Sequence, residues 1–370
     1  MSTTPTNRVR FGLVGCGVIG PTHAAAIGQI SDVAELVAVA DINLDKAKAL
    51  AAKFGVTKVY ASDDALIADN DVDAVAFCTP SGVHADGVVK ALRGGKHAIV
   101  EKPMEVSLAA CDRMIAAERE TGNKLAIISQ HRFDHATVFV KDAMNGGKLG
   151  KLVLADMSVK WFRTQQYYDS GDWRGTWAMD GGGCLMNQGV HTVDLLQYLA
   201  GPVESVHARM ATAAHERIEV EDVVVASLKF KNGAIGTLTA STSCFSGQPA
   251  RIDLYGTAGS AVIEGDTLKY FKLTDGTTVT AAQASAHAQK VASGGTASVQ
   301  DDGQTRLGGE NAAKDPGAVW GDAHAAEFRD FVSAIRTGGR PLIHGVEGRK
   351  PIEIIMAVYE SARSGVEVVL

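Results

Sequence analysis

Two polar segments, far apart along the chain, carry side chains that can move a proton. One is a Glu-Lys-Pro tripeptide that contains Lys102. The other contains Asn187, His191 and Asp194, whose i, i+4 and i+7 spacing would place them on one face of a helix. Amines and imidazoles act as proton-transfer groups when burial or a nearby charge brings their pKa near neutrality. Lys102 and His191 are therefore the candidate catalytic groups, with Asn187 beside them.

Both segments also have structural interpretations. Lys102 could be a surface lysine in a turn. His191 and Asp194 could be a structural pair, or Asp194 could fix the tautomer of a catalytic His191 that acts as a base or orients a hydroxyl. An Asn/His/Asp face is a poor zinc site because it lacks a third good ligand, so no metal is expected.

A glycine-rich turn indicates a bound dinucleotide, which could accept a hydride. Gly15, Gly17 and Gly20 follow an apolar strand and open a small-residue helix, with Val18 and Ile19 inside the loop. Gly15 would permit the tight turn, Gly17 the approach of a pyrophosphate, and Gly20 close packing of helix on strand. The N-terminus of the helix would bind the phosphates. A glycine turn without a ligand is the alternative.

Asp41 indicates which dinucleotide binds. It lies 21 residues after Gly20, at the end of the apolar run 36–40. Its carboxylate would accept hydrogen bonds from ribose hydroxyls and repel a 2′-phosphate, and Ile42 and Asn43 supply no cation. The sequence therefore predicts NAD rather than NADP.

The segment 161–177 is dense in aromatic and arginine residues. Aromatic rings stack on the apolar faces of sugars, and arginines bind hydroxyls, carboxylates or phosphates. We therefore expect Arg163, Tyr168, Trp173 and Arg174 to contact a sugar-like substrate. Ordinary inter-domain packing is the alternative.

Alternating strands and helices must position these groups. Residues 1–130 alternate short apolar strands with helices, which predicts an α/β Rossmann domain with a doubly wound parallel sheet. Lys102 follows the predicted strand 97–100, at the sheet edge where such folds bind ligands.

The pattern of predicted elements changes after residue 130. Residues 131–370 are predicted to form an α+β domain with a large open, mainly antiparallel sheet, whose free face could join subunits. Asn232-Gly233 predicts a hairpin between two of its strands. Residues 281–317 are predicted to be an insertion loop, or alternatively an arm that reaches a neighbouring subunit, and helices return at 324–336 and 347–364.

Composition excludes several classes of protein. The net charge of -6 in 370 residues argues against nucleic-acid binding, which needs a basic surface. No apolar run is long enough to span a membrane, and the first ten residues show no signal-peptide pattern. The five cysteines are odd in number and form no C-x-x-C pair, which fits a cytoplasmic enzyme.

Together these segments resemble the Gfo/Idh/MocA family, the glucose–fructose oxidoreductase and inositol dehydrogenase superfamily. The resemblance covers nearly the whole chain and rests on the segments 15–23, 79–84, 95–103, 181–194, 348–350 and 359–365. It implies that Lys102 and His191 lie at the reacting carbon, and that members pair as homodimers or homotetramers through the open sheet. It also implies nicotinamide contacts near Thr79, Pro80, His84, Glu101 and Lys102.

One departure from the family pattern matters. Many members carry an aspartate four residues before the histidine, where this chain has Asn187, so more of the proton transfer falls on Lys102 or His191. The segment 167–189 looks most like the branch that oxidises a sugar C3 hydroxyl. The resemblance thus implies an NAD-dependent oxidoreductase acting on a ring hydroxyl of a sugar, glycoside or nucleotide sugar. An NAD-dependent glycoside hydrolase and a non-catalytic sugar or cofactor sensor are the alternatives.

Overall fold

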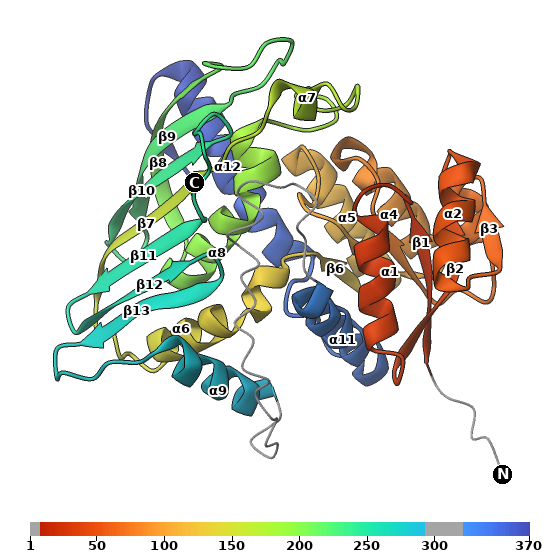
Figure 1. Cartoon of the computed structure of the whole chain (residues 1–370), viewed down its shortest axis with the longest axis horizontal. Coiled ribbons are helices and arrows are strands. Elements are labelled where there is room, and N and C mark those ends of the chain that lie inside the picture. The colour runs from red at the N-terminus through yellow and green to blue at the C-terminus, as the bar shows by residue number, and fades with distance from the viewer. Residues whose placement is uncertain (1–7, 293–320) are drawn as a thin grey trace. The chain divides into compact units, whose positions relative to one another are not determined.

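The computed structural model describes residues 8–292 and 321–370, which divide between two units (Figure 1). Unit 1 comprises Met1–Gln130, Ala178–Gly181 and Trp320–Ile352, and unit 2 comprises His131–Trp177, Gly182–Val319 and Glu353–Leu370. From the sequence, everything after residue 130 was expected to lie in one domain. Residue contacts group Ala178–Gly181 and the described residues 321–352 with unit 1.

Unit 1 contains the predicted parallel sheet, with its strands in the order β3-β2-β1-β4-β5-β6. Every strand pair is parallel. The strands are β1 (Val9–Val14), β2 (Ala34–Ala40), β3 (Lys58–Tyr60), β4 (Ala74–Phe77), β5 (His97–Val100) and β6 (Leu125–Ile127). This arrangement confirms the doubly wound Rossmann fold.

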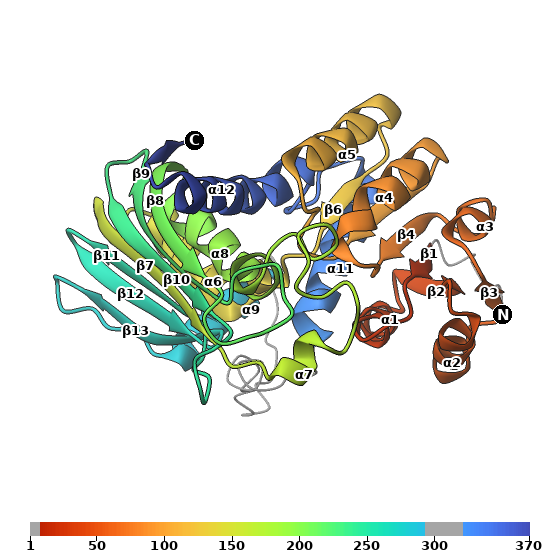
Figure 2. The same cartoon turned by 90° about the horizontal axis from the view of Figure 1, so that it is seen from above.

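Helices cover both faces of this sheet (Figure 2). The helices that connect its strands are α1 (Gly20–Gln29), α2 (Leu44–Phe54), α3 (Asp63–Ile67), η1 (Ser81–Val83), α4 (His84–Arg93) and α5 (Leu108–Thr121). Alternate residues of β1 face opposite ways: Leu13 packs with α2, whereas a side chain at Gly12 would meet Leu66 of α3. The carboxyl ends of the strands consequently remain at one edge, where the predicted site residues lie.

Helix α11 (Gly321–Thr337) explains why the chain returns to unit 1. Its apolar side joins the buried cluster around Phe11 through Phe328, Phe331 and Val332. The ring centroids of Phe11 and Phe328 are 5.4 Å apart. Burial of each such phenylalanine contributes about 1.5–3 kcal/mol. A helical period alone does not reveal which sheet the helix covers.

Unit 2 contains an eight-stranded sheet in the order β13-β12-β11-β7-β10-β9-β8-β14. Its strands are β7 (Leu152–Lys160), β8 (Val203–Ala211), β9 (Val223–Phe230), β10 (Ile235–Ser241), β11 (Arg251–Gly256), β12 (Gly259–Glu264), β13 (Thr267–Leu273) and β14 (Val368–Val369). Only β7 and β10 pair in parallel. The mainly antiparallel sheet is confirmed, as is the hairpin at Asn232-Gly233, where Gly233 has a φ of 87°.

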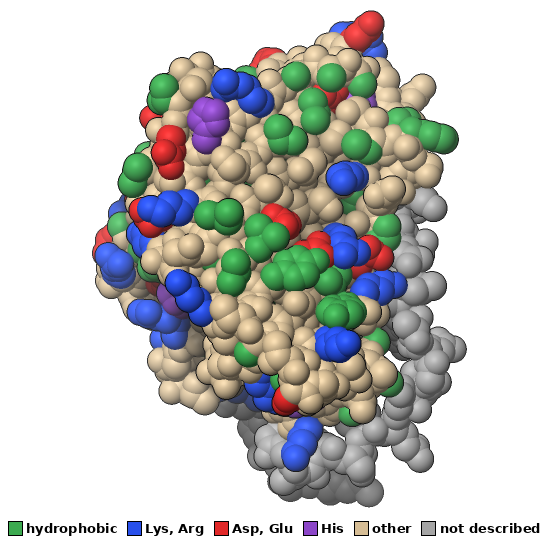
Figure 3. All heavy atoms as spheres, turned by 90° about the vertical axis from the view of Figure 1, so that its left-hand side faces the viewer, with side chains coloured by type: hydrophobic (Ala, Val, Ile, Leu, Met, Phe, Trp, Pro, Cys, Tyr) green, Lys and Arg blue, Asp and Glu red, His purple; other side chains and the backbone are tan. Residues whose placement is uncertain are grey.

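Helices of unit 2 lie on one face of this sheet (Figure 1). They include η2 (Gln130–Phe133), α6 (His135–Asn145), α7 (Gln165–Tyr168), η3 (Cys184–Gly189), α8 (Val190–Ala200), α9 (Ala281–Ala292) and the second half of α12 (Gly345–Ser364). Figure 3 shows apolar side chains exposed on the other face, where Val225, Ile235, Tyr255 and Tyr270 are 39–61% exposed. Among the described helices, none is both long and apolar enough to cross a bilayer.

The first part of the predicted insertion loop is a helix instead. In α9, Ala284 and Ala288 are buried at i and i+4, and the ring of His287 lies 5.5 Å from that of Phe139 on α6. An alanine stripe is a weak hydrophobic signal, which is why composition alone suggested a loop. Residues 293–317 of that predicted loop lie outside the described residues, so neither the loop nor the arm is tested there.

Candidate functional site

The glycine turn lies between β1 and α1, and its geometry suits a dinucleotide. Gly15 has a φ of 96°, and an added Cβ would lie 2.6 Å from the carbonyl carbon of Cys78. A Cβ at Gly20 would lie 2.8 Å from the oxygen of Gly15, whereas one at Gly17 would meet nothing within 4 Å. Side chains are thus excluded at Gly15 and Gly20 by the protein itself, while Gly17 is open toward an approaching ligand.

The N-terminus of α1 is also suited to phosphate. No side chain caps it, and its first turn contains no acidic residue. Its first amides therefore keep their partial positive charge for a bound anion. Val18 is 76% exposed in this loop, and Ile19 occupies the N-cap position.

Asp41 ties the end of β2 to the glycine turn. Its Oδ2 accepts a 2.8 Å hydrogen bond from the Cys16 amide, and its Oδ1 accepts one of 2.7 Å from the Asn43 amide. The bond to Cys16 was not foreseen from the sequence. It holds a carboxylate beside the turn, where it can bind ribose hydroxyls and repel a 2′-phosphate.

His84 connects the loops that follow β4 and β5. Its Nε2 lies 2.9 Å from the Thr79 carbonyl oxygen, and its Nδ1 lies 3.0 Å from that of Pro103. Burial lowers the pKa of this imidazole, although the two carbonyl contacts oppose the shift. The predicted nicotinamide contacts Thr79 and Pro80 are therefore held close to the Glu-Lys-Pro segment.

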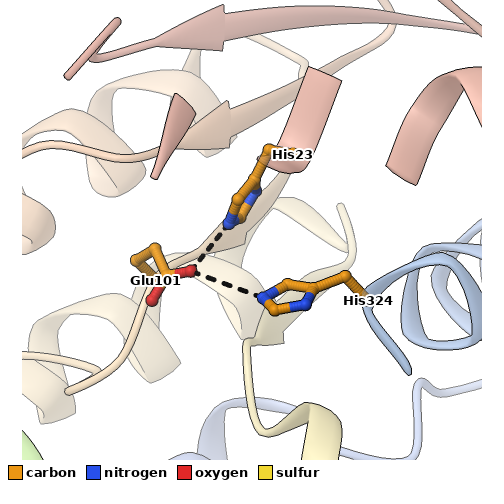
Figure 4. Close-up of side chains that lie close together, drawn as sticks. All are labelled: His23, Glu101 and His324. Atoms are coloured by element: carbon orange, nitrogen blue, oxygen red, sulfur yellow. Dashed lines mark hydrogen bonds and ion pairs between the residues drawn. The ribbon is translucent and has the colours of Figure 1, made fainter. Parts of the chain in front are cut away.

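The side chain of Glu101 points into the interior of unit 1 (Figure 4). Its Oε1 lies 2.7 Å from Nε2 of His23 and 3.9 Å from Nε2 of His324, and its Oε2 accepts a 3.0 Å bond from the Lys102 amide. Burial alone would raise the pKa of Glu101, but the hydrogen bond and charge of His23, aided by Lys102 and His324, hold it at about 2. An ionised Glu101 thus anchors the backbone of Lys102.

This cluster was missed in the sequence because its members come from α1, the loop after β5, and α11. The three groups lie within 4.8 Å of one another, close enough to hold a metal ion. They offer only three donors, and in the described chain Nδ1 of His23 has no hydrogen-bond partner. Structural zinc sites use four ligands, and metal-bound histidines donate their second N–H, so the donor set fits a metal poorly.

In unit 2, Asn187 and His191 lie on adjoining helical segments. Asn187 is in η3, a π-helical turn, and His191 is in α8, whereas the sequence predicted one regular helix. A π turn holds more residues than an α turn, so the i, i+4, i+7 count no longer defines a single stripe. Asn187 and His191 are half-buried, and Asp194 is buried.

Asp194 has a strong partner that sequence spacing did not indicate. Arg132 donates to it bidentately, from Nη2 to Oδ1 at 2.6 Å and from Nε to Oδ2 at 2.8 Å. Such a paired geometry is among the strongest charge-assisted contacts in proteins. Each carboxylate oxygen of Asp194 thus accepts a bond from Arg132, and its role in fixing the His191 tautomer stays a prediction.

The arginine and aromatic segment forms a network around Tyr167 and Gln188. Arg163 donates from Nη2 to Oε1 of Gln188 at 3.0 Å, and Arg174 donates from Nη1 to the Tyr167 hydroxyl at 2.7 Å. Gln188 donates to the Tyr167 hydroxyl at 2.9 Å and to Oδ1 of Asn187 at 2.7 Å. Three predicted site residues are thus joined by two residues that were not predicted to bind.

The other two predicted substrate residues differ in their surroundings. Tyr168 is buried, its hydroxyl lies 2.8 Å from that of Thr242, and burial raises its pKa. Trp173 is half-buried with its ring 4.5 Å from the Arg174 guanidinium. Trp173 can therefore present a face to a ligand, whereas Tyr168 packs inside unit 2.

A buried carboxylate anchors the turn that carries Asn187. Glu221 accepts 2.9 Å bonds from the amides of Gly183 and Leu185, and a 3.0 Å bond from the Tyr359 hydroxyl. Burial raises the pKa of Glu221, and the amide bonds oppose that shift. A Cβ at Gly183 would lie 1.7 Å from the Glu221 carbonyl oxygen, so glycine is required there.

The predicted site residues fall into two groups, each described within its own unit. Unit 1 carries the cofactor group and Lys102, and unit 2 carries Asn187, His191 and the arginine network. The sequence identified members of both groups. It missed their supports Glu221, Tyr167 and Gln188, although the run of three glycines before Cys184 was a signal of a crowded turn.

Comparisons with known proteins cover both units. A family model described as an oxidoreductase family with an NAD-binding Rossmann fold matches residues 9–129, and a GFO/IDH/MocA C-terminal domain model matches residues 137–262. The myo-inositol 2-dehydrogenase of Thermotoga maritima is 30% identical over 68% of this chain and 74% of its own.

Two further relatives match almost end to end. The scyllo-inositol 2-dehydrogenase (NAD(+)) of Bacillus subtilis is 26% identical over 98% of this chain and 97% of its own. The crystal structure of the WlbA dehydrogenase from Bordetella pertussis, in complex with NADH and UDP-GlcNAcA, has a TM-score of 0.81 and 32% identity over 98% of this chain and 99% of that chain.

Proposed function

The chain belongs to the Gfo/Idh/MocA family of NAD-binding oxidoreductases, and from that premise we propose that it oxidises a ring hydroxyl, at C3, of a sugar, glycoside or nucleotide sugar. The observation that carries the proposal is the network of Arg163, Gln188, Tyr167 and Arg174, which is hydrogen-bonded to Asn187 four residues before His191. It sets hydroxyl-binding groups beside a candidate base.

The network also favours a substrate with a negative charge. Within the described chain, Arg174 has no carboxylate partner, and its guanidinium lies 4.4 Å from the Tyr167 ring and 4.5 Å from the Trp173 ring. A half-buried guanidinium between two aromatic rings can bind a carboxylate or phosphate bidentately. Among the substrate classes, a nucleotide sugar or an acidic sugar fits best.

The residues of unit 1 would hold NAD by backbone and carboxylate contacts. The open position at Gly17 and the uncapped α1 would receive the pyrophosphate, and Asp41 would bind the adenosine ribose. The nicotinamide end of NAD would lie near the Glu-Lys-Pro loop, which contains Glu101. Thr79, Pro80 and His84 are close to this loop. NAD, when bound, accepts the hydride.

The protein groups move the proton. Lys102 and His191 bind the substrate hydroxyl, and one of them takes its proton as the hydride leaves carbon. Asn187 is an amide and cannot accept that proton, so it orients the hydroxyl instead. Glu101 and His84 hold the backbone on either side of Lys102 and thereby limit the positions of its amine.

A substrate panel tests this function. Purified protein is incubated with NAD⁺ and, separately, with neutral sugars, uronic acids, glycosides and nucleotide sugars, and NADH absorbance is followed. We expect turnover with a ring-hydroxyl substrate and highest kcat/KM for an anionic one. Trapping the ketone with borodeuteride and locating the deuterium by NMR tests the position. Deuterium at another carbon would refute C3 oxidation, and glycoside cleavage without net NADH would indicate the hydrolase.

Matched variants test the proton-transfer groups. Lys102→Ala and His191→Gln should each lower kcat by about 10²–10⁴-fold, the usual contribution of a positioned acid–base group. The Kd for NADH, measured by fluorescence, should stay near the wild-type value. Lys151→Ala removes an exposed lysine of unit 2 and serves as the control. Unchanged turnover in both catalytic variants contradicts the mechanism.

We further propose that the chain self-associates through the open face of the unit 2 sheet. Ile235 is 61% exposed there, and it lies two strands from the exposed Tyr255, because both residues pair with Leu154 of β7. Sedimentation of the wild type should give a dimer or tetramer, and Ile235→Glu should lower the assembled fraction because it places a charge in an apolar contact. A monomeric wild type would refute the proposal.

A further inference from the structure

A second histidine lies directly against His191. His131, in η2, meets the His191 ring edge to face, with centroids 5.0 Å apart and planes at 88°. On its other side, Nδ1 of His131 lies 2.7 Å from Oδ2 of Asp134 and 3.2 Å from Oδ1 of Asp266. None of these three residues belongs to a motif of the sequence, and the proposed reaction does not use them.

The two carboxylates determine the charge of His131. Burial alone would lower its pKa, but the charges and hydrogen bonds of Asp266 and Asp134 raise it well above the ordinary value. Burial and the charge of Asp266 raise the pKa of Asp134 to about 6, although His131 opposes that shift. The pair of acids therefore favours the imidazolium form of His131.

Asp266, which contacts His131, lies in a turn whose backbone conformation few residue types adopt. It connects β12 and β13 together with Gly265, and the two residues have φ values of 63° and 55°. Left-handed backbone at both central positions is typical of a two-residue hairpin, and aspartate tolerates it better than most side chains. A glycine would suit the backbone as well but would not supply the carboxylate.

Charged groups on the helices around His191 have contacts of their own, and the proposed function adds the Lys102 amine at the substrate hydroxyl. Behind α8, the inward side chains of β7 and β11 are apolar, among them Met157 and Leu254. Arg132 and Asp194 neutralise one another as a buried ion pair, and Lys141 of α6 lies over the Tyr198 ring. The charged group in ring contact with His191 is His131.

We propose that His131, clamped by Asp134 and Asp266, is a positioning residue that holds the His191 ring in place and keeps it uncharged. A positive charge in ring contact with an imidazole disfavours its protonation, and the carboxylates of Asp134 and Asp266, which pair with His131, reduce that effect. His191 would therefore meet the substrate as a neutral base. The inference rests on His191 acting as that base in the proposed function.

His131→Phe separates charge from packing, because phenylalanine keeps a ring against His191 and removes the cation. The acidic limb of the kcat/KM profile should move to higher pH by about 0.6–2.4 units, the range for one charge at 5.0 Å between the effective dielectric constants of water and of a protein surface. The NMR titration midpoint of the labelled His191 ring should move the same way, and the KM for NAD should not change. His287→Phe removes a histidine paired with Asp142 elsewhere in unit 2, and should shift neither.

The outcomes separate this inference from the proposed function. An unchanged or lowered His191 midpoint in His131→Phe overturns the inference, whatever the activity. A raised midpoint together with full activity of His191→Gln supports the charge contact and refutes His191 as the base. If His131→Phe does not fold, His131→Gln removes the same charge with a polar side chain, and the same two readouts decide.

Discussion

Replacing Glu221 is the most direct test of how the fold presents its candidate base. Glu221 comes from the segment before β9, 34 residues after Asn187 in the chain, and accepts bonds from Gly183, Leu185 and Tyr359. In Glu221→Ala these three donors lose their acceptor inside a buried site. At about 1–3 kcal/mol for each unsatisfied donor, the loss in unfolding free energy should be about 3–6 kcal/mol, allowing for water entry.

Glu221→Gln is the milder companion variant. The amide oxygen can still accept from Leu185 and Tyr359, while the amide NH₂ is forced against the Gly183 N–H. Only one donor is lost, so we expect about 1–3 kcal/mol. Because typical domains have only about 5–15 kcal/mol of stability, the alanine variant approaches the limit of folding and the glutamine variant does not.

Urea denaturation and steady-state kinetics check both parts of this argument. The glutamine variant should fold, bind NADH with the wild-type Kd, and lose kcat/KM for substrate, because the π turn that carries Asn187 is no longer fixed at its start. A loss below about 1 kcal/mol in Glu221→Ala would show that the bonds matter little. Lower stability with wild-type kinetics would show that the anchor does not position the site.

Further predictions concern unit 1. Gly17→Ala should keep wild-type stability because its Cβ meets no protein atom, yet weaken NAD binding because that open position would receive the pyrophosphate. Gly20→Ala should lower the melting temperature because its Cβ lies 2.8 Å from a backbone oxygen. Equal effects of the two variants on stability and on NAD binding would contradict the assignment. Asp41→Asn keeps an acceptor and removes the charge, so the NADP-to-NAD ratio of kcat/KM should rise by about tenfold. The pKa of Glu101 is lowered from 4.5 to about 2, so its stabilisation is present above pH 4.5 and is lost as the pH falls toward 2. Glu101→Gln should therefore be less stable than wild type at neutral pH, with a gap that narrows on acidification; a constant gap would count against the pair with His23.

Local chemistry in the sequence was enough to predict the main elements and the cofactor turn. The strand 97–100 begins and ends where its apolar run indicates, and the hairpin lies at Asn232-Gly233 as that dipeptide indicates. Each is specified within a few residues by hydrophobic period, a cap or a glycine. The glycine turn was predictable for the same reason, because its three glycines are required by local backbone geometry and therefore form a recognisable motif.

Side-chain partners were decided by the tertiary structure alone. The Glu101 pair with His23 joins residues 78 positions apart, and the Asp194 pair with Arg132 joins residues 62 apart. Spacing along a helix suggested His191 as the neighbour of Asp194, whereas its bidentate partner Arg132 comes from another helical segment. The sequence determined which groups could do chemistry. The tertiary structure decided which of these groups have a structural role instead. A buried charge must be paired, and its partner can come from any segment that packing brings within hydrogen-bond distance.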